Sequence, residues 1–259
     1  MDDIRAYGDP PYKVALLHGG PGAAGEMTPV AIELSKSHGV LEPFQTASSL
    51  NGQLDELKEF LQAGATPPVS IVGFSWGAML GFMFAARHPS FVKKLVMVGS
   101  PPFDDKHSAG ITRTRLSRLT QRQRAEADDL ASALKDPRSK HKNDSFARLG
   151  QLMSEADAFD PLPHEDEIVY RQDIFERVWK EAEEQRSSGE LLAQGRQIHC
   201  PVIAIHGDYD PHPAEGVWLP LSRVLEDFTF VQLEKCGHKP WVEKHARDKF
   251  YEVLEKLLA

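Results

Sequence analysis

Short, continuously apolar segments recur along this chain and alternate with helix-like segments. Strands that are buried on both faces carry apolar residues without polar alternation, so this pattern predicts a mostly parallel sheet flanked by helices, an α/β fold. The chain has 259 residues, 41% of them hydrophobic, which suffices for one substantial core. The expected strands are residues 12–17, 38–44, 69–73, 94–99, 201–206 and 228–233, with a weaker strand at 3–7.

Two apolar stripes at helical spacing predict helices that cover this sheet. One stripe lies between two expected strands and the other lies near the end of the chain. Their members are Leu50, Leu54, Leu57 and Leu61 in the first, and Val242, Ala246, Phe250, Val253 and Leu257 in the second. We expect both stripes to belong to the core rather than to a cofactor site.

The pentapeptide Gly73-Phe74-Ser75-Trp76-Gly77 lies between an expected strand and the helix-like stretch at 78–86. A serine at this place stands on a sharp strand-to-helix turn and points into the open. Glycines flank it because a side chain at either position would crowd the neighbouring strand and helix. The pattern predicts that Ser75 is a catalytic nucleophile.

A second glycine-rich segment, His18-Gly19-Gly20-Pro21-Gly22, follows the expected strand at 12–17. Such a loop can direct backbone N–H groups at an oxygen that develops negative charge. Pro21 has no N–H, so Gly20 is the expected donor of this loop, and the N–H of Trp76 completes the predicted oxyanion hole. His18 is expected to brace its own loop.

A nucleophilic serine also requires a carboxylate and a histidine later in the chain. The strand at 201–206 ends in the turn-rich segment His206-Gly207-Asp208-Tyr209-Asp210-Pro211, and we expect Asp210 to be the acid, with Asp208 as the alternative. His238 follows the last expected strand and is the predicted general base. His206 and His212 are the alternatives for that role, although we expect each to pack or hydrogen-bond within the turn.

These motifs, in this order, resemble the α/β-hydrolase superfamily, and the HGGPG loop with a tryptophan after the serine resembles its proline iminopeptidase (peptidase S33-like) branch. The resemblance covers nearly the whole chain. It implies a serine hydrolase that cleaves a small ester, an amide or a short peptide without a cofactor. Carboxylesterase and aminopeptidase activity both stay open, as does a receptor that binds a small ligand on the same fold without turnover.

The stretch from residue 104 to 197 interrupts the alternation with long, charged helical segments. We interpret it as a helical lid inserted before the acid-bearing strand, with residues 1–103 and 198–259 as the core domain. An apolar face at helical spacing in the lid either packs on neighbouring helices or covers the site; it comprises Ile174, Phe175, Val178, Trp179 and Ala182. Because lids of the resembled superfamily enclose the nucleophile, Phe103, Phe159 and Trp179 are the expected pocket walls.

Charge is patterned in the lid, where arginines 113, 115, 118, 122 and 124 cluster and the acidic run Glu165-Asp166-Glu167 follows. The net charge of −8 opposes attraction of a polyanion, so we expect a solvated helix face and no nucleic-acid partner. Glu155 and Asp157 are among the acidic residues that the iminopeptidase resemblance implies for binding a substrate's amino terminus.

The remaining sequence features point away from metal, nucleotide and membrane. The chain has no Cys-x-x-Cys, His-Glu-x-x-His or G-x-G-x-x-G arrangement, so we expect no metal and no dinucleotide cofactor. It has no long apolar span, and its two cysteines are expected at opposite ends of the sheet without a disulfide. A soluble, cytoplasmic protein is the expectation, whereas the sequence does not indicate an oligomeric state.

Overall fold

The computed structural model describes residues 3–164 and 168–259, so the acidic run Glu165-Asp166-Glu167 lies outside the described residues. Within them, seven strands form one twisted sheet in the order β1-β4-β2-β5-β6-β8-β9. Only β1 runs antiparallel to its neighbour, which confirms the predicted α/β fold with a mostly parallel sheet. The strands are β1 (Ile4–Tyr7), β2 (Tyr12–Leu17), β4 (Gly39–Pro43), β5 (Val69–Phe74), β6 (Val92–Val98), β8 (Val202–Gly207) and β9 (Phe228–Leu233).

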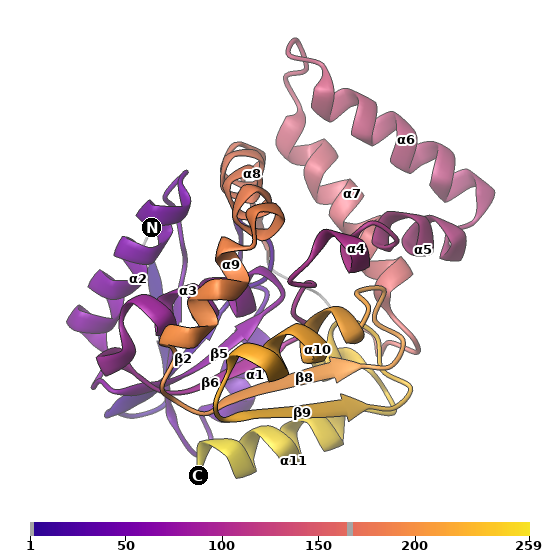
Figure 1. The fold of residues 1–259 in the computed structure, drawn as a ribbon. Coiled ribbons are helices and arrows are strands. Elements are labelled where there is room, and N and C mark those ends of the chain that lie inside the picture. Colours follow the sequence, from indigo (N-terminus) through magenta and orange to yellow (C-terminus); the bar gives the residue numbers. More distant parts are fainter. Residues whose placement is uncertain (1–2, 165–167) are drawn as a thin grey trace.

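Helices cover both faces of this sheet (Figure 1). Alternate residues of each strand point to opposite faces, so Leu16 and Val72 pack with one helical layer, whereas Leu17 and Ile71 pack with the other. The first layer is α1 (Thr28–Leu34) and α11 (Arg247–Leu258), and the second contains α2 (Leu50–Gly64), α3 (Trp76–Arg87) and α10 (Glu215–Val224). The predicted leucine stripe of α2 is fully buried in the second layer.

The C-terminal helix begins later than its apolar stripe predicted. Val242 lies in a short 3₁₀ turn (Pro240–Val242), and α11 starts at Arg247. The buried positions of the helix are Phe250, Leu254 and Leu258, four residues apart. The predicted members Val253 and Leu257 are partly buried and pack against the same cluster, so the stripe belongs to the core as predicted, whereas Val242 and Ala246 precede the helix.

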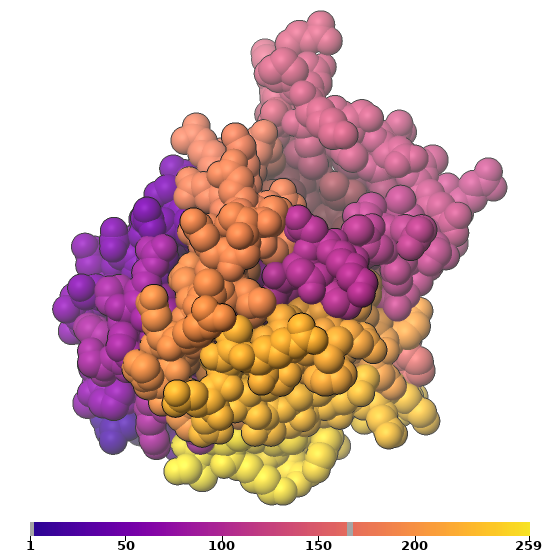
Figure 2. Space-filling model, in the orientation of Figure 1, coloured from indigo at the N-terminus to yellow at the C-terminus, as the bar shows by residue number. Residues whose placement is uncertain are grey.

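Residues between β6 and β8 form a helical segment that stands at the carboxyl edge of the sheet (Figure 1). Its helices α6 and α7 pack against each other, and Figure 2 shows them standing apart from α8 with a recess between. The two-residue strand β7 (Val169–Tyr170) pairs with β3 (Ala23–Ala24), which ties this segment to the loop after β2. The elements are α4 (Asp105–Ser108), α5 (Ile111–Arg118), α6 (Gln121–Lys135), α7 (Lys142–Asp157), α8 (Gln172–Ser188) and α9 (Glu190–Ala193). The division into core and lid stays a prediction.

The order of the strands determines where a ligand can bind. The chain forms β2 first, then β4 on one side of β2, and then β5 on the other side of β2. The strand order therefore reverses between β2 and β5, which is a topological switch point. The connections diverge there and leave a crevice beyond the carboxyl ends of the strands. Both Gly20 and Ser75 lie at this crevice. Among the described residues, no helix is long and apolar enough to cross a membrane.

Candidate active site

Ser75 occupies the turn between β5 and α3 in a strained backbone conformation, with φ 50° and ψ −112°. Its N–H donates to Val98 O at 2.9 Å, which holds the turn against β6. The flanking glycines are required by space: a Cβ on Gly73 would lie 2.2 Å from Gly77 O, and one on Gly77 would lie 2.3 Å from Leu17 O. The turn thus presents the Ser75 side chain to the crevice, as the pentapeptide predicted.

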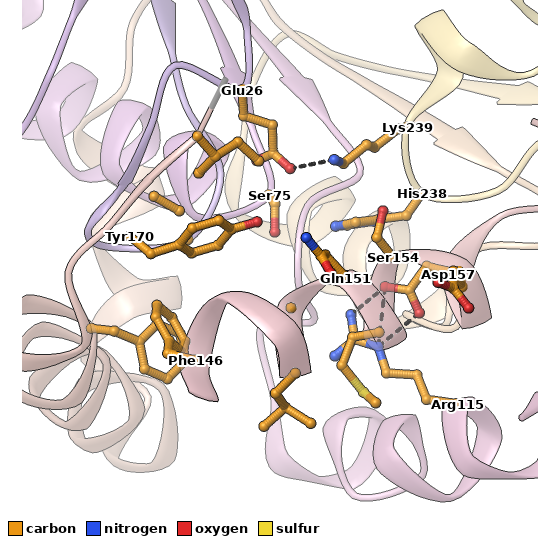
Figure 3. A pocket seen from close by; sticks show the side chains of 18 of the residues that line it. Glu26, Ser75, Arg115, Phe146, Gln151, Ser154, Asp157, Tyr170, His238 and Lys239 are labelled. Carbon is orange, nitrogen blue, oxygen red and sulfur yellow. Dashed lines mark hydrogen bonds and ion pairs between the residues drawn. The ribbon is translucent and has the colours of Figure 1, made fainter. Parts of the chain in front are cut away.

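His238 and Asp210 meet at the ends of β9 and β8. His238 Nδ1 lies 2.7 Å from Asp210 Oδ2 and donates a hydrogen bond to it, and both side chains are almost fully buried. His238 and Ser75 line the same cavity, with the imidazole beside the serine (Figure 3). The alternative acid, Asp208, instead accepts a hydrogen bond from the Cys236 N–H at 3.0 Å. The geometry therefore brings Asp210, rather than Asp208, to the histidine.

The two alternative histidines surround the same carboxylate. His212 donates to Asp210 Oδ1 from Nδ1 at 2.7 Å and from its backbone N–H at 2.9 Å. His206 Nε2 donates to His212 O at 2.8 Å, so both residues bond within the turn as predicted. His18 Nδ1 bonds to Gly19 O at 2.8 Å and braces its own loop, also as predicted.

The electrostatics of this cluster favour an ionised acid and a basic histidine. Burial by itself would raise the pKa of Asp210, but the charges of His238, His212 and His206 hold it well below its usual range. Burial likewise opposes the charged form of His238, but the Asp210 carboxylate outweighs it and raises the pKa of this histidine above its usual range. For His212, burial prevails and lowers the pKa to about 4. His238 is thus the more basic of the two histidines that share Asp210.

The two residues of the predicted oxyanion hole are both close to Ser75: Trp76 follows it directly, and Gly20 lines the same cavity. Trp76 is the first residue of α3, so its N–H is among the orphan donors of a helix N-terminus. Gly20 has a φ of 49°, a conformation that glycine adopts without a steric penalty, and it lines the cavity together with Ser75. The Trp76 side chain points away from solvent, and its Nε1 donates to Gln53 Oε1 at 3.0 Å. Their role as oxyanion donors stays a prediction.

A cavity of about 1000 Å³ opens above Ser75 between the sheet edge and the helices α6, α7 and α8. Trp179 lines it, whereas the other two predicted walls were wrong. Phe103 is 1% exposed and packs in the core, 4.9 Å from the Phe82 ring, because the chain is still leaving the sheet there. Phe159 is 43% exposed and packs edge-on against Tyr209 outside the cavity.

The apolar face of α8 serves both of the roles that its spacing allowed. Ile174, Val178 and Ala182 are buried in the hydrophobic core. Phe175 and Trp179, displaced around the same helix, line the cavity instead. One helix thus both anchors the helical segment on the core and provides a wall of the site.

Comparison with known proteins agrees with this architecture. A family model described as "alpha/beta hydrolase fold" matches residues 46–244. The chain belongs to this family. It is 25% identical over 203 residues to the pimeloyl-[acyl-carrier protein] methyl ester esterase of Nitrosospira multiformis, covering 74% of this chain and 70% of that one. It is 23% identical to lipase 1 of Psychrobacter immobilis over 249 residues, 88% of this chain and 71% of that one.

Among solved structures, the proline iminopeptidase of Mycobacterium smegmatis aligns with a TM-score of 0.63 at 20% identity, covering 98% of this chain and 93% of that one. Together the matches confirm the α/β-hydrolase prediction and identify the protein as a hydrolase with esterase, lipase and peptidase relatives.

One buried carboxylate of this α/β hydrolase was missed by the sequence reasoning. Glu243, 0% exposed, accepts backbone N–H groups of Phe159, Asp160 and Gly237 at 2.8–2.9 Å. It thereby joins the residues that follow α7 to the loop that carries His238, whose own N–H donates to Asp157 O. In the sequence Glu243 is visible only as an acidic residue five positions after His238, and charge patterning alone predicts that such a residue lies at the surface.

Two ion pairs of the hydrolase also lie beside Ser75. Lys239 Nζ lies 2.8 Å from Glu26 Oε1, and Arg115 donates from Nε and Nη2 to both oxygens of Asp157 (Figure 3). All four residues line the cavity. Glu26 and Lys239 were not singled out in the sequence, because nothing local relates two residues more than two hundred positions apart.

The prediction that the lid arginines form a solvated face was wrong for two of them. Arg115 is bound to buried Asp157, as described above. Arg118 donates to Ala156 O and Tyr209 O, and its guanidinium lies 3.7 Å from the centre of the Tyr209 ring. These contacts tie α5 to the end of α7 and to the loop that carries Asp210.

Asp210, His212 and His238 are also the residues of this site that could hold a metal ion, since each offers a ligand atom within 4.8 Å of the others. Both imidazole Nδ1 atoms are already hydrogen-bonded to the carboxylate. A bound cation would have to displace these two protons. The expectation of a metal-free site stays a prediction.

Proposed function

We propose that this hydrolase cleaves an ester or amide by transferring an acyl group first to Ser75 and then to water. In this proposal His238 is the general base, Asp210 orients it, and the N–H groups of Gly20 and Trp76 bind the oxyanion. The observation that carries the proposal is the 2.7 Å contact of His238 with buried Asp210, beside a serine on a strained turn. This combination matches the functional requirements of a serine nucleophile with a base and an orienting acid.

The reaction follows from these positions. Ser75 Oγ attacks the substrate carbonyl carbon while His238 takes the hydroxyl proton, and the imidazolium is stabilised by the Asp210 carboxylate. The carbonyl oxygen becomes an oxyanion, and each well-placed backbone donor contributes roughly 10²–10³ in rate. His238 then gives the proton to the leaving group. Water, activated by the same histidine, releases the acyl group from Ser75.

Ion pairing of two acidic residues in the cavity favours ester over aminoacyl substrates within this chemistry. A substrate with a free amino terminus needs a carboxylate that is available near the nucleophile. Of the predicted candidates, Asp157 gives both oxygens to Arg115, whereas Glu155 accepts one hydrogen bond from the neutral Gln123 amide at 2.7 Å and keeps its charge. Glu26 is paired with Lys239. We therefore place carboxylesterase activity first and proline iminopeptidase-like activity second.

The proposal is tested by labelling with a fluorophosphonate, which reacts with an activated serine whatever the substrate. Wild-type protein is expected to label, and Ser75→Ala and His238→Ala are expected to abolish labelling. Ser100→Ala is the control, since Ser100 follows β6, is buried and donates its hydroxyl to Pro101 O. Labelling that survives in Ser75→Ala would refute the nucleophile. Turnover of a p-nitrophenyl ester, but not of an aminoacyl nitroanilide, would support the order of substrates given above.

An absence of labelling in correctly folded wild-type protein would favour the receptor alternative. A receptor is expected to bind one small ligand tightly and to hydrolyse it negligibly, whereas the proposed enzyme turns over many acyl substrates. Titration calorimetry with the non-hydrolysed ligand, beside the labelling experiment, separates these outcomes.

A further inference from the structure

The cavity above Ser75 has two chemically different sides (Figure 3). One side is rich in apolar rings and is called here the aromatic arm, made by Phe146, Leu149, Tyr170, Phe175 and Trp179. Glu176, Lys180 and Glu183 of α8 also line the cavity beside these rings. The other side is called the polar arm and is made by Arg115, Gln151, Ser154 and Asp157. Ser75 lies between them in Figure 3. A ligand that reacts at Ser75 therefore meets different surroundings on each side of its carbonyl group.

The aromatic arm is a continuous wall of rings. Trp179 is stacked on Phe175 at 5.9 Å with an interplanar angle of 7°, and behind it lies the ring of Trp76, fully buried and outside the cavity lining, at 6.2 Å. Phe175 lies 4.7 Å from Phe146, whose ring meets Tyr170 edge-on at 5.7 Å. All four rings of the arm line the cavity. Such a wall binds uncharged apolar groups through dispersion and loss of hydration.

The whole cavity, along both arms, is longer than a short ester needs. Helix α7 carries Phe146 and Leu149 near its start and Asp157 at its last turn. Residues 146 to 157 of a helix span roughly 16 Å at 1.5 Å per residue. With about 1000 Å³ available, the cavity is at the upper end of the range for drug-sized ligands.

The polar arm lies on the side of the general base. Asp157 O accepts the backbone N–H of His238 at 3.0 Å, and the charges of Asp157 and Arg115 act on the His238 imidazole. The aromatic arm, in contrast, adjoins the oxyanion loop, since Tyr170 pairs with Ala23 in the small sheet. The base and the aromatic arm therefore lie on opposite sides of Ser75.

This arrangement determines which part of a substrate enters which arm. His238 must give its proton to the leaving group, so the leaving group lies on the histidine side. The acyl group then extends to the other side, into the aromatic arm. We infer that the substrate of this site is an ester with a large, uncharged apolar acyl group and a small or polar alcohol part, an inference that rests on the proposed function.

The decisive experiment compares two isomeric esters, methyl octanoate and heptyl acetate, with the purified wild-type protein. Both contain the same atoms and a primary alkoxide leaving group, but they place the alkyl chain on opposite sides of the carbonyl. Acid release is followed by titration at constant pH. We expect kcat/KM to favour methyl octanoate by at least ~10-fold; burial of each methylene contributes about 0.8 kcal/mol, or roughly fourfold. Equal rates or a preference for heptyl acetate would overturn the inference.

Variants then test the aromatic arm itself. Leu149→Trp fills it and is expected to lower the kcat/KM ratio of p-nitrophenyl octanoate to acetate by at least ~10-fold. Asp129→Trp, on the exposed side of α6, adds the same bulk outside the cavity and is expected to keep the wild-type ratio. Phe146→Ala removes a distal ring without adding bulk, and it should lower the same ratio even if Leu149→Trp fails to fold. An unchanged ratio in folded Leu149→Trp and Phe146→Ala would refute the role of the aromatic arm in binding the acyl group.

These measurements separate failure of the inference from failure of the proposed function. If wild-type protein labels with fluorophosphonate at Ser75 but hydrolyses acetate and octanoate esters equally, the proposed function stands and the inference of an apolar acyl group is refuted. If the protein neither labels nor hydrolyses any of these esters, both the proposed function and the inference are refuted.

Discussion

Replacing Glu243 by alanine tests how the helical segment holds the candidate base. The carboxylate is fully buried and accepts three backbone N–H groups, from Phe159, Asp160 and Gly237. Gly237 directly precedes His238, so loss of Glu243 releases the loop on which the imidazole stands. The variant is expected to affect both the free energy of unfolding and turnover.

The magnitude follows from the donors that are left without an acceptor. Each buried N–H without a partner costs about 1–3 kcal/mol, and hydrogen bonds to a charged group lie at the upper end of the usual range. Allowing for partial relaxation and entry of water, we expect Glu243→Ala to lower the unfolding free energy by about 4 kcal/mol. For a chain of this size that corresponds to a fall in Tm of roughly 10 °C.

The matched variant Glu243→Gln keeps the shape and one acceptor oxygen. Oε1 accepts from Phe159 and Gly237, whereas Oε2 accepts from Asp160. A glutamine oriented to keep Oε1 serves the first two donors and places its NH₂ against the third. We expect a loss of about 1–2 kcal/mol, between wild type and alanine. Glu234→Ala, at an exposed position of the same loop, should stay within about 0.5 kcal/mol of wild type.

The assay is thermal unfolding by circular dichroism, together with ester turnover measured well below each variant's Tm. A Tm that falls by less than ~2 °C in Glu243→Ala would refute the role assigned to the three hydrogen bonds. A large fall in Tm with wild-type turnover at low temperature would show that the contacts stabilise the fold without positioning His238.

Further predictions concern the charges around the imidazole. Asp210→Asn is expected to lower kcat about 10⁴-fold. The kcat of Asp208→Asn, which retains an acceptor for the Cys236 N–H, should stay near that of wild type. Equal losses of kcat in steady-state assays would contradict the choice of acid. Because Asp210 raises the pKa of His238 and the base must be neutral, wild-type kcat/KM should fall as pH drops through the raised pKa of this histidine. In Asp210→Asn this limb should move to lower pH. Arg115 lowers the pKa of His238 and Asp157 raises it, so Arg115→Met should move the same limb to higher pH; a shift to lower pH would contradict the assigned geometry.

Much of the fold could be predicted because its signals are local. Each expected strand is present to within two residues at either end, and the α2 stripe is buried as its spacing indicates. The start of α11 shows the limit of that reasoning. Val242 fits the apolar period, yet the chain turns there, and a turn set by tertiary packing is not visible in the period itself.

The pocket walls could not be predicted in the same way. Phe103, Phe159 and Trp179 look alike in sequence, as large aromatic residues in or beside a helical segment. Only the packing of the segment separates them: the first enters the core, the second lies outside the cavity and the third lines it. The aromatic arm likewise assembles from α7, β7 and α8, which no spacing along the chain relates.

By itself the sequence determined the order of strands and helices along the chain and the loops that hold Ser75, Asp210 and His238. The reason is that apolar runs and flanking glycines specify local structure over a few residues. Tertiary structure alone decided that Asp210 rather than Asp208 meets the histidine, and that Lys239 pairs with Glu26. The physical reason is that burial and pairing of charges depend on residues brought together from distant parts of the chain. The free energy of a buried or paired charge depends on the residues around it in the folded protein, and a local sequence pattern does not specify these residues.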